Sequence, residues 1–439
     1  MLLVNTKVQQ GCSALLDLQK QREETMDQFD LIMIGGGISG SAMAIVMARA
    51  GHKVLVLERS EQFEDQVRGE WIAPWGVAEV QRLGLYDLLM GAGGHHLTHH
   101  ITYDEVRKPE EAEAAPLPLG MFLPDVPGPL CIGHPKHCQT LFDEAVRSGA
   151  TALRGVNVLS VVTGPAPSVT YEQDGVTHTA SARMVVGADG RNSMVRDAAA
   201  ITLNADRPHH MFGGMLVEGV EGWDEHTQAI GTEGEFDFLA FPQGDGKVRV
   251  YGSYSLDERS RFAGPDGPKR FLESFRVNCS PRNRHIADGR PAGPLRSYAN
   301  NDTWTDTPFA QGAVLVGDAA GWNDPIIGLG LSITYRDVRL VTDLLLSSQD
   351  WSPALLAPYA EERKERMRRL RFVAKIQSSL DAEFGDVARQ RRHSYFERAA
   401  SDPTLGLHGF AVMGGPEVAP PETFTAAYRE RVLGVEPQL

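Results

Sequence analysis

The sequence has little cysteine, no excess of positive charge and no long apolar run. Four cysteines in 439 residues are too few for a disulfide framework. Asp and Glu outnumber Lys and Arg by 57 to 43, and a net charge of −14 argues against nonspecific binding to nucleic acid or to an acidic membrane. No apolar run is long enough to span a bilayer, and residues 1–26 lack a signal-peptide pattern. We therefore expect a cytoplasmic protein with no nucleic-acid partner and no stable membrane insertion.

The most informative segment begins directly after Met26. An apolar run, Leu31–Ile34, has the composition of a buried strand, and Ile38–Ala50 has the composition of a helix. A second apolar run, Val54–Leu57, follows and is succeeded by an acidic residue, Glu58. The order strand, helix, strand and acid predicts the βαβ unit that binds dinucleotides.

Three glycines between the first strand and the helix give this unit its chemistry. Gly35 allows a tight turn, Gly37 lets the backbone approach a pyrophosphate, and Gly40 lets the helix pack closely on the strand. The helix N-terminus offers free N–H groups to phosphate, and Glu58 can accept hydrogen bonds from a ribose. The cofactor-binding residues predicted from this segment are Gly35, Gly37, Ile38, Ser39, Gly40, Glu58 and Arg59.

Two later motifs also place an acid at the end of an apolar strand. In "ARMVVGADGRNSMVR" the strand is followed by Asp189, and in "VLVGDAAGWNDPIIGLGLS" it is followed by Asp318. The second motif then runs through Pro325, Gly328 and Gly330 into a helix. A helix start with almost no bulky side chains predicts that a ligand approaches its N-terminus.

The three motifs, in this order, resemble those of class A flavoprotein monooxygenases of the para-hydroxybenzoate hydroxylase type. The resemblance extends from about Asp27 to Asp350. It implies FAD as cofactor, with Asp189 and Asp318 in its site and Asp318 on the ribityl chain. It also implies that the helix N-terminus at Gly330 and Leu331 approaches the flavin and stabilises the anionic reduced form.

The same resemblance implies the reaction. NADPH or NADH reduces the flavin, O₂ adds to give a flavin C4a-hydroperoxide, and one oxygen passes to a small organic substrate by hydroxylation or epoxidation. The Pro325 carbonyl is expected to face the reacting flavin edge, and Asp324 is expected to orient or deprotonate a phenol. Arg68, Gly328 and His134 join the predicted cofactor site, although relatives often carry Arg or Gln where His134 stands.

The segment between Ile201 and Thr307 has the texture of a β-sheet. In relatives such a sheet covers the flavin, so we expect Phe236, Phe238 and Tyr251 to line a chamber for an aromatic or polycyclic substrate. The alternative, that these aromatic side chains are simply part of the core, stays open. Later, "EERKERMRRLRF" predicts a helix with a solvated charged face.

The predicted fold is α/β. A Rossmann-like FAD-binding domain of the glutathione-reductase type carries an inserted, mainly antiparallel β-sheet and a C-terminal helical tail. The expected parts are a poorly ordered extension 1–26, a first FAD-binding part 27–200 with a substrate-side insertion near 90–130, a substrate sheet 201–307, a second FAD-binding part 308–350, and a helical region 351–439.

Several alternatives remain at this stage. Two His-rich stretches, "CIGHPKHC" and "GGHHLTHH", invite a zinc hypothesis, but the first coincides with a strand-to-helix junction and we expect no metal. A halogenase or reductase on the same fold, a two-component monooxygenase, and a catalytically idle FAD protein that binds a ligand are the rival functions. Substrate-dependent NAD(P)H consumption distinguishes the last from an enzyme. A homodimer is left open.

Overall fold

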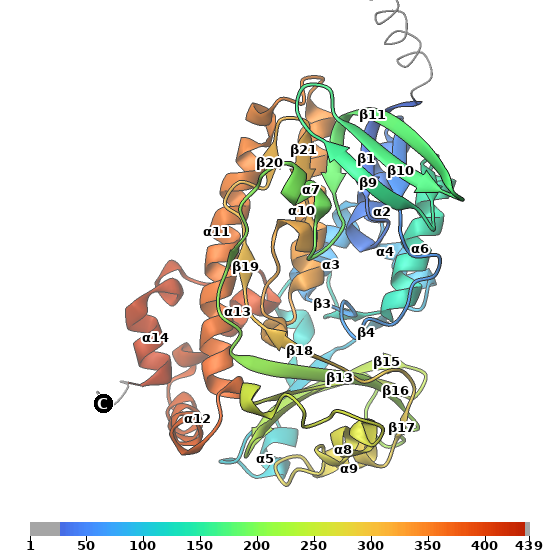
Figure 1. Cartoon of the computed structure of the whole chain (residues 1–439). Helices are drawn as coiled ribbons and strands as arrows, with labels where there is room; N and C mark the ends of the chain where they lie inside the picture. Colours follow the sequence, from blue (N-terminus) through green and yellow to red (C-terminus); the bar gives the residue numbers. More distant parts are fainter. Residues whose placement is uncertain (1–26, 435–439) are drawn as a thin grey trace, which may run out of the picture.

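Two large β-sheets organise residues 27–434, the part of the chain that the computed structural model describes (Figure 1). The predicted extension 1–26 lies outside these residues. The strands of the first sheet run in the order β20-β21-β11-β1-β2-β8, and β9 and β10 extend it from β11. Their bounds are β1 Asp27–Ile34, β2 Val54–Leu57, β8 Thr151–Leu153, β9 Asn157–Val162, β10 Ser168–Gln173, β11 Val176–Gly187, β20 Phe309–Ala310 and β21 Ala313–Leu315.

The centre of the first sheet is parallel and buried. β1 pairs in parallel with both β2 and β11, and β21 pairs in parallel with β11. All four residues of β2 and the last four of β1 are buried, as their continuous apolar composition predicts for strands covered on both faces. β21 therefore brings the third motif beside the first two, although it lies far along the chain.

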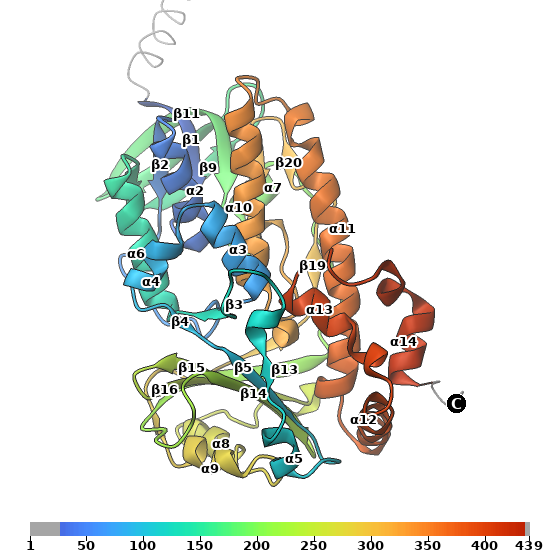
Figure 2. The ribbon, with the colours of Figure 1, turned by 180° about the vertical axis from the view of Figure 1, so that it is seen from behind.

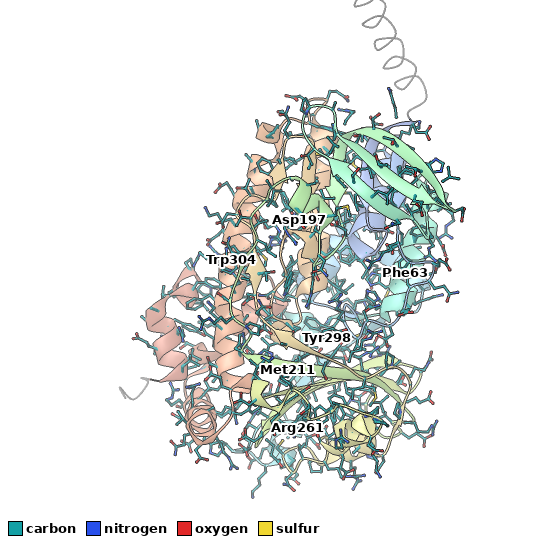
Figure 3. All side chains as sticks on the ribbon, in the orientation of Figure 1. Phe63, Asp197, Met211, Arg261, Tyr298 and Trp304 are labelled. Carbon is teal, nitrogen blue, oxygen red and sulfur yellow. The ribbon has the colours of Figure 1, made fainter. Side chains whose placement is uncertain are left out.

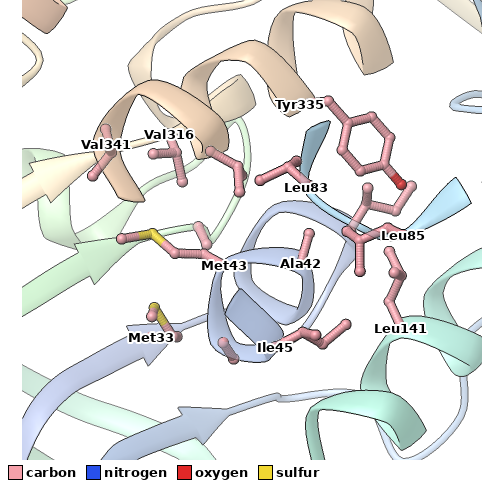
Figure 4. Packing of buried hydrophobic residues seen from close by; sticks show 14 of the residues in the cluster. Met33, Ala42, Met43, Ile45, Leu83, Leu85, Leu141, Val316, Tyr335 and Val341 are labelled. Atoms are coloured by element: carbon pink, nitrogen blue, oxygen red, sulfur yellow. The ribbon is translucent and has the colours of Figure 1, made fainter. Parts of the chain in front are cut away.

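Helices cover one face of this sheet. The helix that follows the glycine loop, α2 (Ile38–Arg49), contributes Ala42, Met43 and Ile45 to the core that Figure 4 shows. Met33 of β1 and Tyr335 also belong to this core. The other helices on this side are α3 Pro74–Arg82, α4 Tyr86–Gly91, α6 His134–Arg147 and α10 Gly330–Ser347, while the short α7 Met194–Ala198 follows β11.

The second sheet lies below the first in Figure 1 and is mainly antiparallel. Its order is β17-β13-β16-β15-β14-β5-β6, with β18 beside β13. The bounds are β5 His99–Tyr103, β6 Leu117–Pro118, β13 His210–Glu218, β14 Thr227–Glu233, β15 Phe236–Gly244, β16 Lys247–Tyr254, β17 Arg290–Pro291 and β18 Arg296–Asn300. β5 pairs in parallel with β14, so a strand from early in the chain completes this sheet.

One face of the second sheet is covered by short helices and the other faces the first sheet. The covering helices are α5 Pro109–Glu113, α8 Gly267–Glu273 and α9 Arg284–Ala287. Figure 3 shows Tyr298 of β18 in the region between the two sheets and Arg261 on the far side with the short helices. The small strands β3 Trp71–Ile72, β4 His95–His96 and β7 Leu130–Cys131 form a separate ribbon, and β12 Asn204–Ala205 pairs with β19 Thr303–Trp304.

The C-terminal region is helical and spans both sheets. The long helix α11 (Pro353–Gln377) runs beside the first sheet and ends near the second, as the views from front and back agree (Figures 1 and 2). A π-helical turn at Ser378–Ala382 then leads to α12 Asp386–Ala399, α13 His408–Met413 and α14 Ala426–Leu433. Within residues 27–434, no helix combines the length and the apolar character that a membrane crossing requires. The predicted α/β class, with an inserted sheet and a helical tail, is confirmed.

The charged segment of α11 is the predicted helix, but two of its arginines depart from the predicted solvated face. Arg363 and Arg366 are buried, and both bind Asp337 of α10, at 3.0 Å and 2.7 Å. Arg363 also donates hydrogen bonds to the backbone carbonyls of Ala320 and Gly321, at 2.9 Å and 3.1 Å. Arg363 and Arg366 are therefore internal ties between two helices and the third motif, whereas Glu361, Lys364, Glu365 and Arg368 are exposed and form the predicted solvated face.

Candidate functional site

A cavity of about 850 Å³ lies between the two sheets and joins most of the predicted site. Ligand sites in proteins have volumes of this order. The predicted residues that line it are Gly37, Ile38, Ser39, Arg68, His134, Tyr251, Asp318, Pro325, Gly328, Gly330 and Leu331. The predicted residues that do not line it are Gly35, Gly40, Glu58, Arg59, Asp189, Phe236, Phe238 and Asp324. The three motifs thus meet at one cavity. The predicted residues that do not line it have other structural roles, described below.

The three loop glycines occupy different surroundings. Gly35 has φ +98°, and a Cβ there would lie 2.4 Å from the carbonyl oxygen of Ala188. At Gly40 a Cβ would lie 1.9 Å from the carbonyl oxygen of Gly35, so helix and strand need a glycine to pack. At Gly37 a Cβ would meet nothing within 4 Å. Gly35 and Gly40 therefore build the loop, and Gly37 leaves its cavity side open to a ligand.

Glu58 ties the loop to the end of β2. One carboxylate oxygen accepts the Gly36 N–H at 2.8 Å and the other accepts the Ser60 N–H at 2.7 Å. Each oxygen keeps a second lone pair for a ribose hydroxyl. Arg59 is exposed and lies outside the cavity lining.

Asp189 does not line the cavity but stabilises the turn that does. One carboxylate oxygen accepts the backbone N–H of Met194 at 2.7 Å, at the start of α7. Burial raises the pKa of Asp189. The flanking residues Ala188 and Gly190 line the cavity in its place. The second motif thus presents backbone to the cavity, while its acid holds the turn.

Asp318 faces the cavity beside a cation that the site prediction missed. The Arg191 guanidinium donates to the Asp318 carboxylate at 3.3 Å and lies 4.9 Å from the ring of Trp322. Arg68, Arg191 and Trp322 all line the cavity. Arg191 stands two residues after Asp189 in the second motif, so this position was the signal that could have identified it.

The third motif ends in a helix whose N-terminus opens on the cavity. Gly328 has φ +67°, and a Cβ there would lie 3.1 Å from the Trp71 ring. A Cβ at Gly330, the first residue of α10, would meet nothing within 4 Å. The free N–H groups and positive end of α10 are thus accessible to a ligand that carries negative charge.

Asp324 does not line the cavity and its carboxylate is occupied by other partners, which argues against its predicted role with a phenol. It accepts the Ile326 N–H at 3.0 Å and lies 3.1 Å from His209 Nε2 and 3.5 Å from His210 Nε2. Burial opposes ionisation, but His210 and the hydrogen bond from His209 lower the pKa of Asp324. Asp324 therefore fixes the turn that presents Pro325.

Among residues 27–434, one group of three metal-binding side chains comes together, namely His209, His210 and Asp324. The hydrogen bond to Asp324 raises the pKa of His209, so an ion pair explains this group without a metal. The His-rich stretches have other partners. His137 bonds Tyr335 at 2.5 Å, and His96 bonds Tyr86 at 2.9 Å.

Of the three predicted aromatic residues of the second sheet, Tyr251 lines the cavity, whereas Phe236 and Phe238 do not. Phe236 and Phe238 lie in the core on the far face, where their rings contact that of Phe275. Leu239 and Phe241 of the same strand line the cavity with Tyr251. The face of β15 that meets the cavity is the opposite of the one expected. The strand is buried on both faces, and its polar residues Asp237 and Gln243 share the cavity face with Leu239 and Phe241, which made the Phe236 and Phe238 face look like the one for an apolar ligand.

Residues of the C-terminal helices close the cavity and were missed altogether. The lining from this region includes Gln377, Leu380, Asp381, Tyr395, Phe396, His408 and Phe410. They follow the third motif, in a segment whose only visible pattern was helical. No residue type or spacing in it indicated contact with a ligand.

The geometry fits FAD. The open backbone at Gly37 and the N-terminus of α2 suit a pyrophosphate, Asp318 suits the hydroxyls of a ribityl chain, and the open N-terminus of α10 suits the electron-rich edge of a reduced flavin. These three features belong to one continuous cavity, which an extended dinucleotide requires.

Comparison with known proteins agrees with this fit. A family model described as an FAD binding domain matches residues 28–372. Squalene monooxygenase from Mus musculus is 25% identical over 332 residues, 73% of this chain, and the chain spans only 55% of that protein. The 3-demethoxyubiquinol 3-hydroxylase of Escherichia coli is 25% identical over 367 residues, 80% of this chain and 88% of that protein.

Among solved structures, a p-nitrophenol 4-monooxygenase from Pseudomonas putida has a TM-score of 0.75 at 18% identity, covering 89% of this chain and 99% of that one. At this identity the structural likeness concerns the fold alone. The family model, in contrast, matches well over half of the chain. The chain therefore belongs to the FAD-binding-domain family of class A flavoprotein monooxygenases, which are FAD-dependent oxidoreductases.

Proposed function

We propose that this protein uses NADPH or NADH and O₂ to insert one oxygen atom into an aromatic or polycyclic small molecule, by hydroxylation or epoxidation. The observation that carries the proposal is the continuity of one cavity. Its lining passes from the FAD motifs to a chamber formed by Phe212, Leu239, Phe241 and Tyr251. A substrate in that chamber lies directly beside the Pro325 turn.

Reduced FAD supplies the electrons and the centre at which O₂ is activated. The protein binds and orients the cofactor. The backbone N–H groups of Ile38 and Ser39 would bind the pyrophosphate, Asp318 would hold the ribityl hydroxyls, and the N-terminus of α10 would stabilise negative charge on the reduced ring. The acid Asp324 holds the turn and does not act as a base.

The apolar side chains of the chamber exclude water from the reacting centre. Ile326 and Ile327, which follow Pro325, are buried, and Leu239 and Phe241 lie in the same apolar cluster. Exclusion of water favours transfer of oxygen to the substrate over release of peroxide. Relatives named for squalene, demethoxyubiquinol and p-nitrophenol support a largely apolar or aromatic substrate here.

We further propose that residues 27–200 and 308–350 hold FAD, that residues 201–307 provide the floor of the chamber, and that the protein works in the cytoplasm, where NAD(P)H is abundant. Whether a homodimer forms is a matter for sedimentation analysis.

Asp318→Ala is expected to abolish retention of FAD, whereas Asp197→Ala, at an exposed residue of α7, is expected to preserve it.

The test is anaerobic mixing of the FAD-loaded protein with NADPH, and separately with NADH, in the presence and absence of aromatic compounds. Bleaching of the visible flavin absorbance, followed by O₂ uptake and an oxygenated product, is the expected result. A protein that consumes no NAD(P)H with any substrate would be a ligand binder. One that oxygenates only when FAD is reduced by a separate reductase would be half of a two-component system. Failure to hold FAD would refute the proposal.

A further inference from the structure

A chain of hydrogen bonds crosses the floor of the cavity from the third motif toward the outer end of β5. Trp71 Nε1 donates to Gln228 Oε1 at 2.9 Å. Gln228 Nε2 lies 3.2 Å from His100 Nδ1, and His100 Nε2 lies 2.9 Å from Thr102 Oγ1. All four side chains line the cavity. The Trp71 ring also packs against Gly328, so the chain starts at the turn that faces the flavin.

The direction of every bond in this chain follows from its first member. An indole N–H can only donate, so the Gln228 atom facing Trp71 must be its carbonyl oxygen, and the Gln228 amide nitrogen must face His100. Because the Gln228 amide donates to it, His100 Nδ1 must be the acceptor and carries no proton. The proton of the neutral ring then sits on Nε2 and is donated to Thr102 Oγ1.

The hydrogen-bonded side chains Trp71, Gln228, His100 and Thr102 carry no charge. Burial lowers the pKa of His100 to about 4, so the ring is neutral at physiological pH. Arg107 donates to the Thr102 carbonyl at 2.8 Å, and its charge is paired with Asp104 at 2.6 Å. The site therefore offers no net charge to attract an anion.

The chain ends on a hydroxyl whose proton is uncommitted. Thr102 Oγ1 accepts from His100, and in residues 27–434 no hydrogen bond is donated by this hydroxyl. The residues paired with it on the next two strands are apolar, since Ile230 pairs with Thr102 and Leu239 pairs with Ile230. A free donor beside apolar side chains on the wall of a cavity favours a ligand that supplies an acceptor there.

We propose that Thr102 donates a hydrogen bond to an acceptor oxygen of the substrate, and that His100 and Gln228 are positioning residues that hold this hydroxyl as a donor. The substrate class is then an apolar ring compound that carries a carbonyl, ether or hydroxyl oxygen away from the oxidised position. A pure hydrocarbon such as squalene would leave the Thr102 proton unsatisfied. This inference rests on the proposed function for the site, and it narrows the substrate.

Two probes of one skeleton test the acceptor. They are 1-tetralone, which has a ring carbonyl, and tetralin, which lacks it. Their dissociation constants are measured by perturbation of the flavin spectrum in the FAD-loaded wild type, Thr102→Val, Thr102→Ser and Thr232→Val. Thr232 also lines the cavity, but its hydroxyl donates to Asp237 at 3.2 Å, so it is the matched control.

Thr102→Val is expected to weaken binding of 1-tetralone by about three- to tenfold and to change binding of tetralin by less than about twofold. Thr102→Ser should restore 1-tetralone binding, and Thr232→Val should affect the two probes equally. Equal effects of Thr102→Val on both probes, or none on 1-tetralone, would overturn the proposal.

The donor and acceptor assignment along these hydrogen bonds can be measured directly from the protonation of the two His100 ring nitrogens. In protein labelled with ¹⁵N-histidine, the His100 ring is expected to show a protonated Nε2 and an unprotonated Nδ1, with assignment by loss of the signal in His100→Gln. The opposite tautomer would overturn the assignment of Thr102 as donor. Neither measurement requires turnover. A failed monooxygenase assay would therefore leave the Thr102 proposal intact, and a failed binding test would leave the proposed monooxygenase function intact.

Discussion

At the scale of single residues, two glycines three positions apart have opposite reasons to be glycine. Gly37→Ala is expected to leave the unfolding midpoint of the FAD-free protein within about 1 °C of wild type, because a Cβ there meets nothing within 4 Å. It should weaken FAD binding at least tenfold, because the methyl group occupies the space of the ligand. Gly40→Ala should destabilise the protein by about 2 kcal/mol or more, because its Cβ would overlap the Gly35 carbonyl.

FAD titration by fluorescence quenching and thermal unfolding of the FAD-free protein separate the two effects. If Gly37→Ala bound FAD normally, the pyrophosphate would not lie at this loop. A lower unfolding midpoint for Gly37→Ala would mean that the loop has no space for a Cβ at this position, contrary to the geometry described above.

The group around Asp324 predicts a dependence of stability on pH. The hydrogen bond to Asp324 raises the pKa of His209, so the stabilisation from this ion pair is complete below the ordinary imidazole pKa of 6.5 and is lost as pH rises through the raised value. The lowered pKa of Asp324 keeps it ionised at pH 5.5. Buried Asp302, whose pKa burial and Asp324 raise to about 7, adds repulsion at high pH.

Asp324→Asn should therefore lower the unfolding midpoint more at pH 5.5 than at pH 8.5, with a difference of about 1–2 °C after allowance for the partial exposure of His209. Thermal scans of both proteins at the two pH values provide the check. Burial lowers the pKa of His210, so this ring favours its neutral form more than His209 does. A larger effect at pH 8.5 would contradict the ion pair.

At the scale of elements, α10 and α11 are held together by a buried ion pair. Arg363→Ala would leave Asp337 with Arg366 at 2.7 Å and the Gly317 N–H at 2.9 Å as partners, and it should cost about 2–3 kcal/mol in the free energy of unfolding, because buried acceptors lose their donor. The matched control is Arg368→Ala on the same helix. Arg368 is about half exposed and pairs with Glu365, so its loss should stay within about 0.5 kcal/mol.

Urea unfolding of the two variants gives the comparison. Because Arg363 also binds the carbonyls of Ala320 and Gly321, its loss should weaken FAD binding as well. Similar stability for the two variants would contradict a structural role for the buried Arg363.

The same elements show what the sequence could and could not predict. The unit from β1 to β2 was predictable because its signals are local: an apolar run, spaced glycines and a final acid. Burial of Arg363 was not predictable, because its partner lies on another helix. Which face of β15 meets the cavity was not predictable either, because helices cover one face and the cavity the other, and the cavity face carries buried Asp237 beside Leu239 and Phe241. The contribution of Asp381 and Phe410 depends on how the C-terminal helices fold back.

At the scale of the whole molecule, FAD contacts both early and late parts of the chain, so its removal should loosen the entire structure. FAD at 100 times its dissociation constant should add about 2.7 kcal/mol to the free energy of unfolding. FMN lacks the adenosine half that the Glu58 end of the site would bind, and at equal concentration it should give less than about a third of the shift in unfolding midpoint. Thermal scans with FAD, FMN and ADP test this, and equal shifts for FAD and FMN would mean that the Gly37 loop is not used.

The order in which strands enter the sheets also sets when the protein can fold during its synthesis. β5 leaves the ribosome long before β14, its parallel neighbour, and β1 leaves long before β21 completes the first sheet. A nascent chain that ends at Asn300 therefore has its glycine loop but lacks Asp318, α10 and the helix that holds them. The cofactor site is assembled only late in translation, and until then the apolar edge of β11 that receives β21 has no partner strand and is a surface for chaperones to protect.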